Sequence, residues 1–262
     1  MERKFIEWLE RFPTLESLAA STQRDVLLAW SGMGYNRRAL LLHKTATELV
    51  VKFGGVIPGD PEILITLPGI GRYTSHAIAS FAFARRVPLV DVNIRRVISR
   101  LAERQPFKNS LIDENTVWRL AGEYLPKRKV AQWNQALMDF GATVCTTVNP
   151  SCPECPVTDL CASSGNMKKS RTNTRKSQPI PRRIYRGKII EFLRGRTPTH
   201  SATFSQIGFQ IKPGFSEEHH LWLQDILATL QRDSMIVTFF RKKTVDVSRD
   251  SFPLASLKIS LV

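Results

Sequence analysis

Four cysteines lie close together and are the residues of this sequence with the most definite chemistry. The 262 residues contain no other cysteine, and the four stand at Cys145, Cys152, Cys155 and Cys161. A disulfide framework usually distributes its cysteines along the chain, so this clustering indicates a metal site in a reducing compartment. Four thiolates on one short, proline-rich segment can surround a zinc ion or an iron–sulfur centre, and the spacing alone does not choose between them.

Asp91 stands between the apolar segment VPLV and the helical pattern VNIRRVISRL. An aspartate at this place is a good N-cap, because its carboxylate can accept a hydrogen bond from an amide of the first helical turn. A carboxylate fixed there can also stabilise positive charge that develops on a sugar ring while a leaving group departs. Capping and catalysis are compatible, so both interpretations stay open for Asp91.

The segment LPGIGRYT, residues 67–74, connects two helical patterns and contains Gly69 and Gly71. Two glycines permit a tight turn with an exposed backbone. The helix that follows offers N–H groups and the positive end of its dipole, which together can bind a phosphate. An ordinary helix–helix turn has a similar composition, so this segment is either a structural turn or a phosphate-binding hairpin.

The chain carries a formal net charge of +15, from 38 Lys and Arg against 23 Asp and Glu. Such a field attracts polyanions, and it favours a nucleic acid as the partner. No apolar run reaches membrane-spanning length, and the segment MERKFIEWLERF lacks the features of a signal peptide. We therefore expect a cytoplasmic, nucleoid-associated protein without a membrane partner.

The elements that must position these residues are mostly helical. Residues 1–165 repeat apolar side chains at helical spacing in FIEWLERF, DVLLAWSGMGY, LLLHKTATELVVKFG and VNIRRVISRLAER, with short breakers between them. This pattern predicts an all-α domain over residues 1–165. Residues 166–183 contain no acidic and no aromatic residue and predict a flexible basic linker, which either contacts phosphates or is a solvated spacer.

Residues 184–262 predict a second, smaller domain. IYRGKIIEFLRG indicates a helix, SATFSQIGFQI a short helix and turn, and SEEHHLWLQDILATLQRD a longer helix. MIVTFFRKKTVDVS alternates as strands do, and LKISLV is a further candidate strand. Three helices followed by a β-ribbon is the order of a winged helix, so the fold class is mainly α with a small α+β winged-helix-like domain.

Several motifs occur together in an order that resembles a known family. LPGIGRYT, VDVNIRRV, WNQALMDFGATVC and the cysteine loop follow one another as in the endonuclease III-like helix-hairpin-helix DNA glycosylases. RFPTLESLA and WSGMGYNRRALLLHKTA resemble, in addition, the adenine DNA glycosylases of the MutY type. The resemblance extends from Met1 to about Ser163 and implies a helix-hairpin-helix fold that acts on mispaired DNA in base excision repair.

The resemblance implies roles for individual residues in catalysis and at the mispair. Asp91 matches the catalytic aspartate. Tyr73 occupies the position at which bifunctional relatives carry a Schiff-base lysine, which implies a monofunctional glycosylase. Tyr35 matches a tyrosine that inserts into the duplex beside the mispaired purine, and its alternative role is aromatic packing in the core.

Further matched residues are implied to bind phosphate or metal. Gly69, Gly71 and Arg72 fall on the phosphate-binding hairpin. The spacing of the cysteines, with 6, 2 and 5 intervening residues, is similar to that of the [4Fe-4S] loop in endonuclease III-like glycosylases. The resemblance therefore implies a [4Fe-4S] cluster with the ligands Cys145, Cys152, Cys155 and Cys161.

The sequence also departs from the family pattern. Val92 stands where the adenine glycosylases usually have glycine, and Asn36 replaces a frequent second aromatic residue after Tyr35. The family's first barrel helix, with its general-acid glutamate, precedes the position that aligns with Met1, so no residue here is assigned that role. We therefore expect the chain as written to be a slow glycosylase. Residues 184–262 are too short for the β-rich domain that recognises 8-oxoguanine in the family.

Three functions follow as hypotheses. The first is a monomeric glycosylase that removes adenine paired with G or 8-oxoguanine in double-stranded DNA. The second is a thymine glycosylase acting on G·T mispairs, because such relatives also carry a tyrosine and an aspartate at the positions of Tyr73 and Asp91. The third is a DNA-binding relative without catalysis, in which the winged helix contacts DNA and the glycosylase body acts as a clamp.

Overall fold

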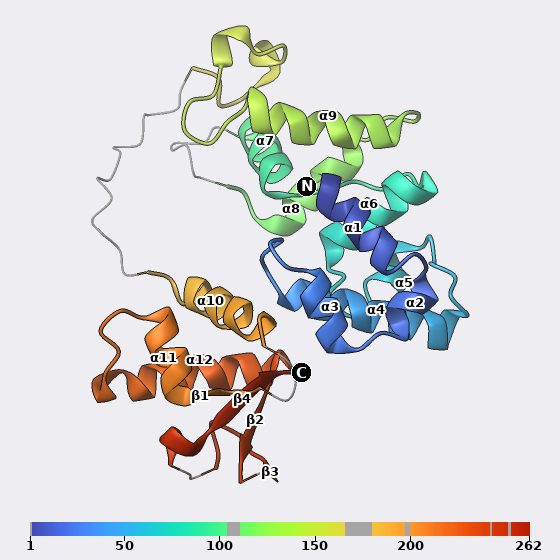
Figure 1. The fold of residues 1–262 in the computed structure, drawn as a ribbon. Coiled ribbons are helices and arrows are strands. Elements are labelled where there is room, and N and C mark those ends of the chain that lie inside the picture. Colours follow the sequence, from blue (N-terminus) through green and yellow to red (C-terminus); the bar gives the residue numbers. More distant parts are fainter. Residues whose placement is uncertain (1, 104–110, 166–179, 197–199, 242, 251–252) are drawn as a thin grey trace. The chain divides into compact units, whose positions relative to one another are not determined.

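The computed structural model describes residues 2–103, 111–165, 180–196, 200–241, 243–250 and 253–262 (Figure 1). Contacts divide the chain into two compact units. The first unit combines Met1–Val56 with Lys176–Val262, and the second unit is Ile57–Arg175. Most of the linker predicted over residues 166–183 lies outside the described residues. The domain boundaries proposed from the sequence, 1–165 and 184–262, stay a prediction.

The N-terminal part of the first unit consists of short helices. They are α1 (Glu2–Arg11), α2 (Leu15–Ala19), α3 (Gln23–Ala29) and α4 (Arg37–Phe53). Thr14 and Thr22 accept hydrogen bonds from backbone amides of α2 and α3 and so begin these helices. Helix α3 ends sooner than DVLLAWSGMGY suggests, because Gly32 at φ +79° and Gly34 at φ +68° form a turn in the left-handed region.

The C-terminal part of the first unit has the element order predicted for a winged helix. Its elements are α10 (Arg182–Arg194), β1 (Ala202–Thr203), α11 (Phe204–Ile211), η3 (Glu217–His219), α12 (His220–Arg232), β2 (Ile236–Phe240), β3 (Lys243–Thr244), η4 (Leu254–Ser256) and β4 (Lys258–Leu261). The antiparallel sheet has the order β1-β4-β2-β3, with Ile236 opposite Leu261 and Ala202 opposite Ile259. Strand β1 falls within SATFSQIGFQI and was not predicted, because two residues show no periodicity. Helix α10 begins two residues before the predicted IYRGKIIEFLRG.

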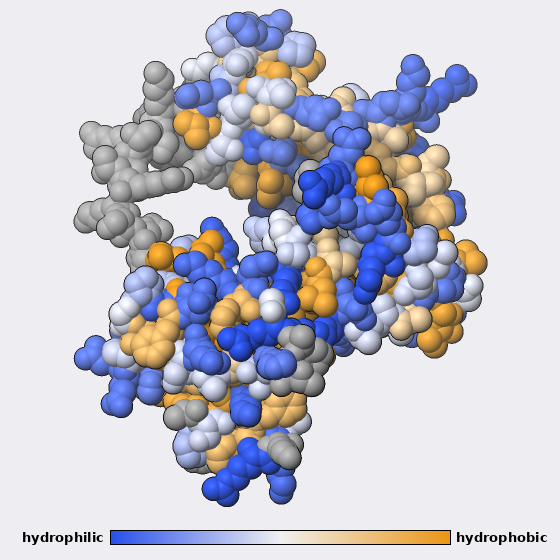
Figure 2. Space-filling model, in the orientation of Figure 1, coloured by the Kyte–Doolittle hydropathy of each residue, from blue (hydrophilic) through white to orange (hydrophobic). Residues whose placement is uncertain are grey.

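One apolar core fills this C-terminal segment and continues toward the N-terminal helices. Ile189, Phe204, Leu227 and Ile259 are buried in it together with Leu27 of α3 and Leu40 of α4. On the face seen in Figure 2, apolar residues of the segment appear only as small separate patches among hydrophilic ones. Burial of the shared core therefore connects the segment to α3 and α4.

The second unit is a helical bundle with an appended cysteine loop. Its elements are α5 (Pro61–Leu64), α6 (Arg72–Phe83), α7 (Val92–Ala102), α8 (Glu114–Glu123), α9 (Val130–Thr143), η1 (Cys152–Glu154) and η2 (Thr158–Leu160). Helix α7 packs against both α8 and α9. Its Ile94 and Ile98 form a buried cluster with Leu89, Val117 and Trp118. The mainly helical fold predicted for this part of the chain is confirmed. Of the helices that the structure describes, none has the length and apolar character needed to cross a membrane.

Candidate active site and cysteine loop

The predicted hairpin lies between α5 and α6 in the second unit. Gly69 adopts φ +77°, which a residue with a Cβ atom rarely does, and Ile70 donates a backbone hydrogen bond to Leu67 at 3.2 Å. Gly71 is the N-cap of α6 and supplies no side-chain cap. A Cβ atom built on Gly71 would meet no atom within 4 Å, so the backbone there is open to an approaching group. This geometry suits a phosphate at the start of α6.

Arg72, at the first position of α6, is exposed, but its guanidinium lies over a protein ring. The guanidinium carbon is 4.1 Å from the centroid of Trp118, a cation–π contact. The ring of His76 lies 4.8 Å from the same indole, and burial lowers the pKa of His76. The structure therefore places Arg72 in an aromatic cluster next to the hairpin.

Asp91 is the N-cap of α7, as one of its two interpretations predicts. Its Oδ1 accepts a hydrogen bond from the Ile94 amide at 2.7 Å, and its Oδ2 accepts one from Asn93 Nδ2 at 3.1 Å. The carboxylate is half-buried and follows Leu89 and Val90, which are buried. Both oxygens are thus held in a fixed orientation. A carboxylate oriented in this way can stabilise a positive charge that develops nearby.

Tyr73 lies close enough to Asp91 for the two to interact electrostatically. Burial raises the pKa of the Tyr73 phenol, and the negative charge of Asp91 raises it further. The hydroxyl donates to Met138 Sδ at 3.5 Å, and 38% of the residue is exposed. The structure therefore brings together these two predicted residues from separate helices, with Tyr73 as a neutral phenol.

Tyr35 belongs to the first unit, whereas Asp91 and Tyr73 belong to the second. It is 78% exposed and has a φ of +48°, in the left-handed region. An exposed aromatic ring on a strained backbone costs free energy of order 1–3 kcal/mol and is seldom kept for packing. The observed exposure does not agree with the alternative role of Tyr35 in the core.

A buried arginine that sequence reasoning missed connects Asp91 to the cysteine loop. Arg96 is 8% exposed and donates to the carbonyls of Cys145 at 2.9 Å and Gly141 at 2.6 Å. It also donates to Asn93 Oδ1 at 2.9 Å, and Asn93 in turn donates to Asp91. The signal in the sequence is a pair of arginines four residues apart, Arg96 and Arg100, within an apolar helix pattern.

Helix α9 approaches the start of α7 at a glycine. Asn93, two residues after Asp91, leaves no room for a side chain at Gly141. A Cβ atom built on Gly141 would lie 2.7 Å from the Asn93 Cβ atom and 3.2 Å from the Asn93 backbone carbonyl. Only glycine therefore lets the two helices meet at this place.

Gly141→Ala is expected to lower the free energy of unfolding by about 1–3 kcal/mol, because the added methyl group displaces the start of α7. Urea denaturation followed by circular dichroism measures this. Gly122→Ala on α8 is the matched control, since a Cβ atom there meets nothing within 4 Å. Equal stability of the two variants would show that the start of α7 can move to accommodate the methyl group without a loss in the free energy of unfolding.

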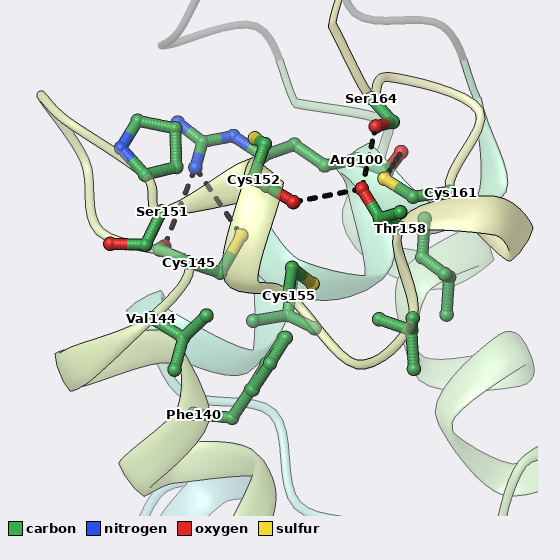
Figure 3. Close-up of a pocket in the computed structure, with 14 residues that line it drawn as sticks. Arg100, Phe140, Val144, Cys145, Ser151, Cys152, Cys155, Thr158, Cys161 and Ser164 are labelled. Atoms are coloured by element: carbon green, nitrogen blue, oxygen red, sulfur yellow. Dashed lines mark hydrogen bonds between the residues drawn. The ribbon is translucent and has the colours of Figure 1, made fainter.

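The four cysteines line one small pocket of the second unit (Figure 3). All four are half-buried and free of disulfides. Burial raises the pKa of the Cys161 thiol, and the other three cysteines raise it further, which reflects their proximity. Phe140 and Val144 form an apolar part of the pocket wall. The four cysteines therefore border the same pocket, and their role as ligands of one centre stays a prediction.

Arg100 connects the cysteine loop to α7. It is 1% exposed and donates to the Thr146 carbonyl at 2.8 Å, the Thr147 carbonyl at 3.3 Å and Cys145 Sγ at 3.3 Å. These contacts hold the start of the cysteine loop against α7. Within the described residues, however, no three His, Cys, Asp or Glu side chains converge as ligands of one metal ion. Four thiols in one half-buried pocket are nevertheless the donor set that suits a metal centre.

Comparisons with known proteins agree with the motifs. The profile of the "HhH-GPD superfamily base excision DNA repair protein" matches residues 1–121. The adenine DNA glycosylase of Mycobacterium tuberculosis (strain ATCC 25618 / H37Rv) is 38% identical over 198 residues, which are 72% of this chain and 62% of that protein. The human adenine DNA glycosylase is 39% identical over 155 residues, 59% of this chain and 28% of that protein. The chain thus spans less than two thirds of the length of these relatives.

Solved structures lead to the same superfamily. A thermostable thymine-DNA glycosylase has a TM-score of 0.55 at 26% identity and covers 61% of this chain and 74% of its own. A non-covalent endonuclease III–DNA complex has a TM-score of 0.54 at 25% identity and covers 62% of this chain and 74% of its own. With the hairpin, the capped aspartate and the cysteine loop in the same order, these likenesses confirm the resemblance that the motifs indicate. The chain is thus similar to the HhH-GPD superfamily of base excision DNA repair proteins, whose profile matches its residues 1–121.

Proposed function

We propose that this chain is a DNA glycosylase that removes adenine mispaired with guanine or 8-oxoguanine. The observation that carries the proposal is the Asp91 carboxylate, fixed by two hydrogen bonds at the start of α7 beside Tyr73, in a chain similar to adenine DNA glycosylases. The proposed partner is double-stranded DNA with a mispair. We further propose that the protein acts as a monomer in the cytoplasm, associated with the nucleoid.

The proposed reaction is hydrolysis of an N-glycosidic bond. The base leaves with the bonding electron pair, and positive charge develops on the deoxyribose. Water adds to C1′ to give an abasic site, and the proton that this water loses ends on the released base. Asp91 stabilises that charge, because its negative charge is fixed in direction before the reaction begins. Tyr73 has no amine with which to form a Schiff base, which supports a monofunctional enzyme. The exposed start of α6, with Gly69, Gly71 and Arg72, is proposed to bind a phosphate, and Tyr35 to insert beside the mispair.

A second candidate function is removal of thymine from G·T mispairs. The likeness in fold to a thymine-DNA glycosylase favours it. A third candidate, binding of DNA without catalysis, draws on the net charge of +15 and on the winged helix.

Base release under single-turnover conditions tests these candidates. Protein in excess is incubated for long times with duplexes containing A·G, A·8-oxoguanine, G·T or a normal T·A pair, and abasic sites are cleaved with alkali. We expect adenine release from the first two duplexes only. Thymine release from G·T would support the second candidate, and tight binding without release from any duplex would support the third. Either result would overturn the proposal.

We also propose that Cys145, Cys152, Cys155 and Cys161 hold a [4Fe-4S] cluster. Support comes from the shared pocket, from the cationic Arg100 beside Cys145 Sγ, and from the 6-2-5 spacing, which resembles that of endonuclease III-like glycosylases. The proposed role is structural: the cluster orders the loop that follows α9.

Protein purified without oxygen is expected to be yellow-brown and to contain about four iron atoms per chain. Elemental analysis and the visible spectrum measure this, and Cys155→Ser provides the comparison, with expected loss of iron. Colourless protein with one zinc per chain would show that the site is a zinc site.

A further inference from the structure

Two helices of the first unit begin in the same unusual way. Arg37 and Arg38 open α4, and Arg182 and Arg183 open α10. Neither helix has an acidic residue in its first turn, and neither receives a side-chain cap. The N-terminal end of a helix carries partial positive charge, so two arginines there are unfavourable unless an anion offsets them.

Two other helices, α3 and α8, follow the usual preference. Helix α3 has the cap Thr22 and Asp25 in its first turn, and α8 has the cap Asp113 and Glu114. The residue that could cap α4 is Asn36, but its Oδ1 accepts a hydrogen bond from Arg194 Nη2 at 2.7 Å. The starts of α4 and α10 therefore lack the capping and acidic side chains that α3 and α8 have.

Both helix starts line one groove of about 810 Å³. Apolar residues of α10 and α12, among them Ile190 and Leu230, contribute to its wall. An exposed aromatic side chain and five guanidinium groups also line the groove, and they belong to Tyr35, Arg37, Arg38, Arg182, Arg183 and Arg186.

The charges of the groove are only partly neutralised. Asp233 forms ion pairs with Arg37, at 3.4 Å, and with Arg186, and Asp225 pairs with Arg182. Arg38 and Arg183 are exposed and have no acidic partner among the described residues. Five arginines against two aspartates leave a positive excess in the groove.

Hydrogen bonds of Arg194 join the two sides of the groove, which are the start of α4 and helix α10. Arg194, whose side chain is 8% exposed, donates to the Leu27 carbonyl at 3.0 Å and to Asn36 at 2.7 Å. Leu27 and Leu40 are buried in the same core as α10 and α12. Asp233 joins the start of α4 to α10 through its two arginine partners. The arginines therefore converge as a consequence of the fold.

We propose that this groove binds the sugar–phosphate backbone of DNA, so that α10 of the winged helix extends the contact surface beyond Tyr35. Guanidinium groups suit phosphate oxygens, and the two helix dipoles add to the attraction. Tyr35, which lines the groove and is 78% exposed, offers a ring face on which a base can stack. The inference rests on the proposed function in that the ligand is DNA.

The test compares two double variants with the same change in charge. Arg38→Gln with Arg183→Gln removes the unpaired arginines of the groove. Arg119→Gln with Arg249→Gln removes two exposed arginines outside it, whose side chains are 60% and 85% exposed. The dissociation constant for a duplex is measured between 50 mM and 300 mM salt, and hydroxyl-radical footprinting locates the protected backbone.

The groove variant is expected to bind about 10- to 100-fold more weakly near 100 mM salt, with a slope of log K against log salt that is smaller by about 2. Its footprint is expected to lose one stretch of protected backbone, while the control variant keeps the wild-type footprint. Equal losses in both variants would reduce the effect to net charge and overturn the proposal. Equally tight, groove-dependent binding of polyglutamate would assign the groove to an acidic protein. Because these readouts are binding and protection, they are independent of whether any base is released.

Discussion

Asp91→Asn is expected to lower the single-turnover rate of adenine release by at least about a hundredfold, while affinity for mispaired duplex stays within threefold of wild type. Asparagine is as good an N-cap as aspartate, so the hydrogen bond from the Ile94 amide, now 2.7 Å, is retained. The substitution removes the negative charge, which is needed mainly in the transition state. It therefore separates the two interpretations of Asp91 that the sequence leaves open.

Asp113→Asn is the matched control for this experiment. Asp113 caps α8 by accepting a hydrogen bond from the Thr116 amide at 3.0 Å, and it lies outside the proposed site. We expect Asp113→Asn to leave the rate of base release unchanged. Turnover of Asp91→Asn at the wild-type rate would reduce Asp91 to a helix cap and remove the main support for the proposed mechanism.

Arg100→Met is expected to have the largest effect on stability, a loss of about 3–5 kcal/mol in the free energy of unfolding. Arg100 is 1% exposed, and its guanidinium donates hydrogen bonds to the carbonyls of Thr146 and Thr147 and to the sulfur of Cys145. Methionine fills much of the volume but donates no hydrogen bond, so these buried acceptors lose their donor. The loop that carries the cysteines then keeps the contact of Arg96 with the Cys145 carbonyl but loses those of Arg100.

Urea denaturation monitored by circular dichroism measures the loss, and the rate at which iron of the proposed cluster is released to a chelator measures the state of the loop. Arg100→Lys is expected to lie between wild type and Arg100→Met, because a lysine keeps the charge but not the planar set of donors. Arg119→Met is the surface control, since the Arg119–Glu123 pair is exposed and contributes little. A free energy of unfolding equal to that of wild type for Arg100→Met would show that the cysteine loop does not depend on the Arg100 hydrogen bonds.

Local patterns determined much of this protein. Helical spacing of apolar residues predicted α4, α7 and α12, because each of these helices buries one face and exposes the other. The order of helices and strands after Ile184 predicted the winged helix. The spacing of the four cysteines predicted a single metal centre, and the structure shows that they line one pocket.

Tertiary structure decided the features that depend on residues far apart in the sequence. Arg96 donates to a carbonyl 49 residues away and Arg100 to one 46 residues away, so their roles arise only when α9 and the cysteine loop fold against α7. Strand β1 has two residues and exists because β4 pairs with it. The arginines that begin α4 and α10 are separated by more than a hundred positions, and a shared core brings them to one groove. Packing of distant apolar faces sets these distances, and local periodicity carries no information about which faces meet.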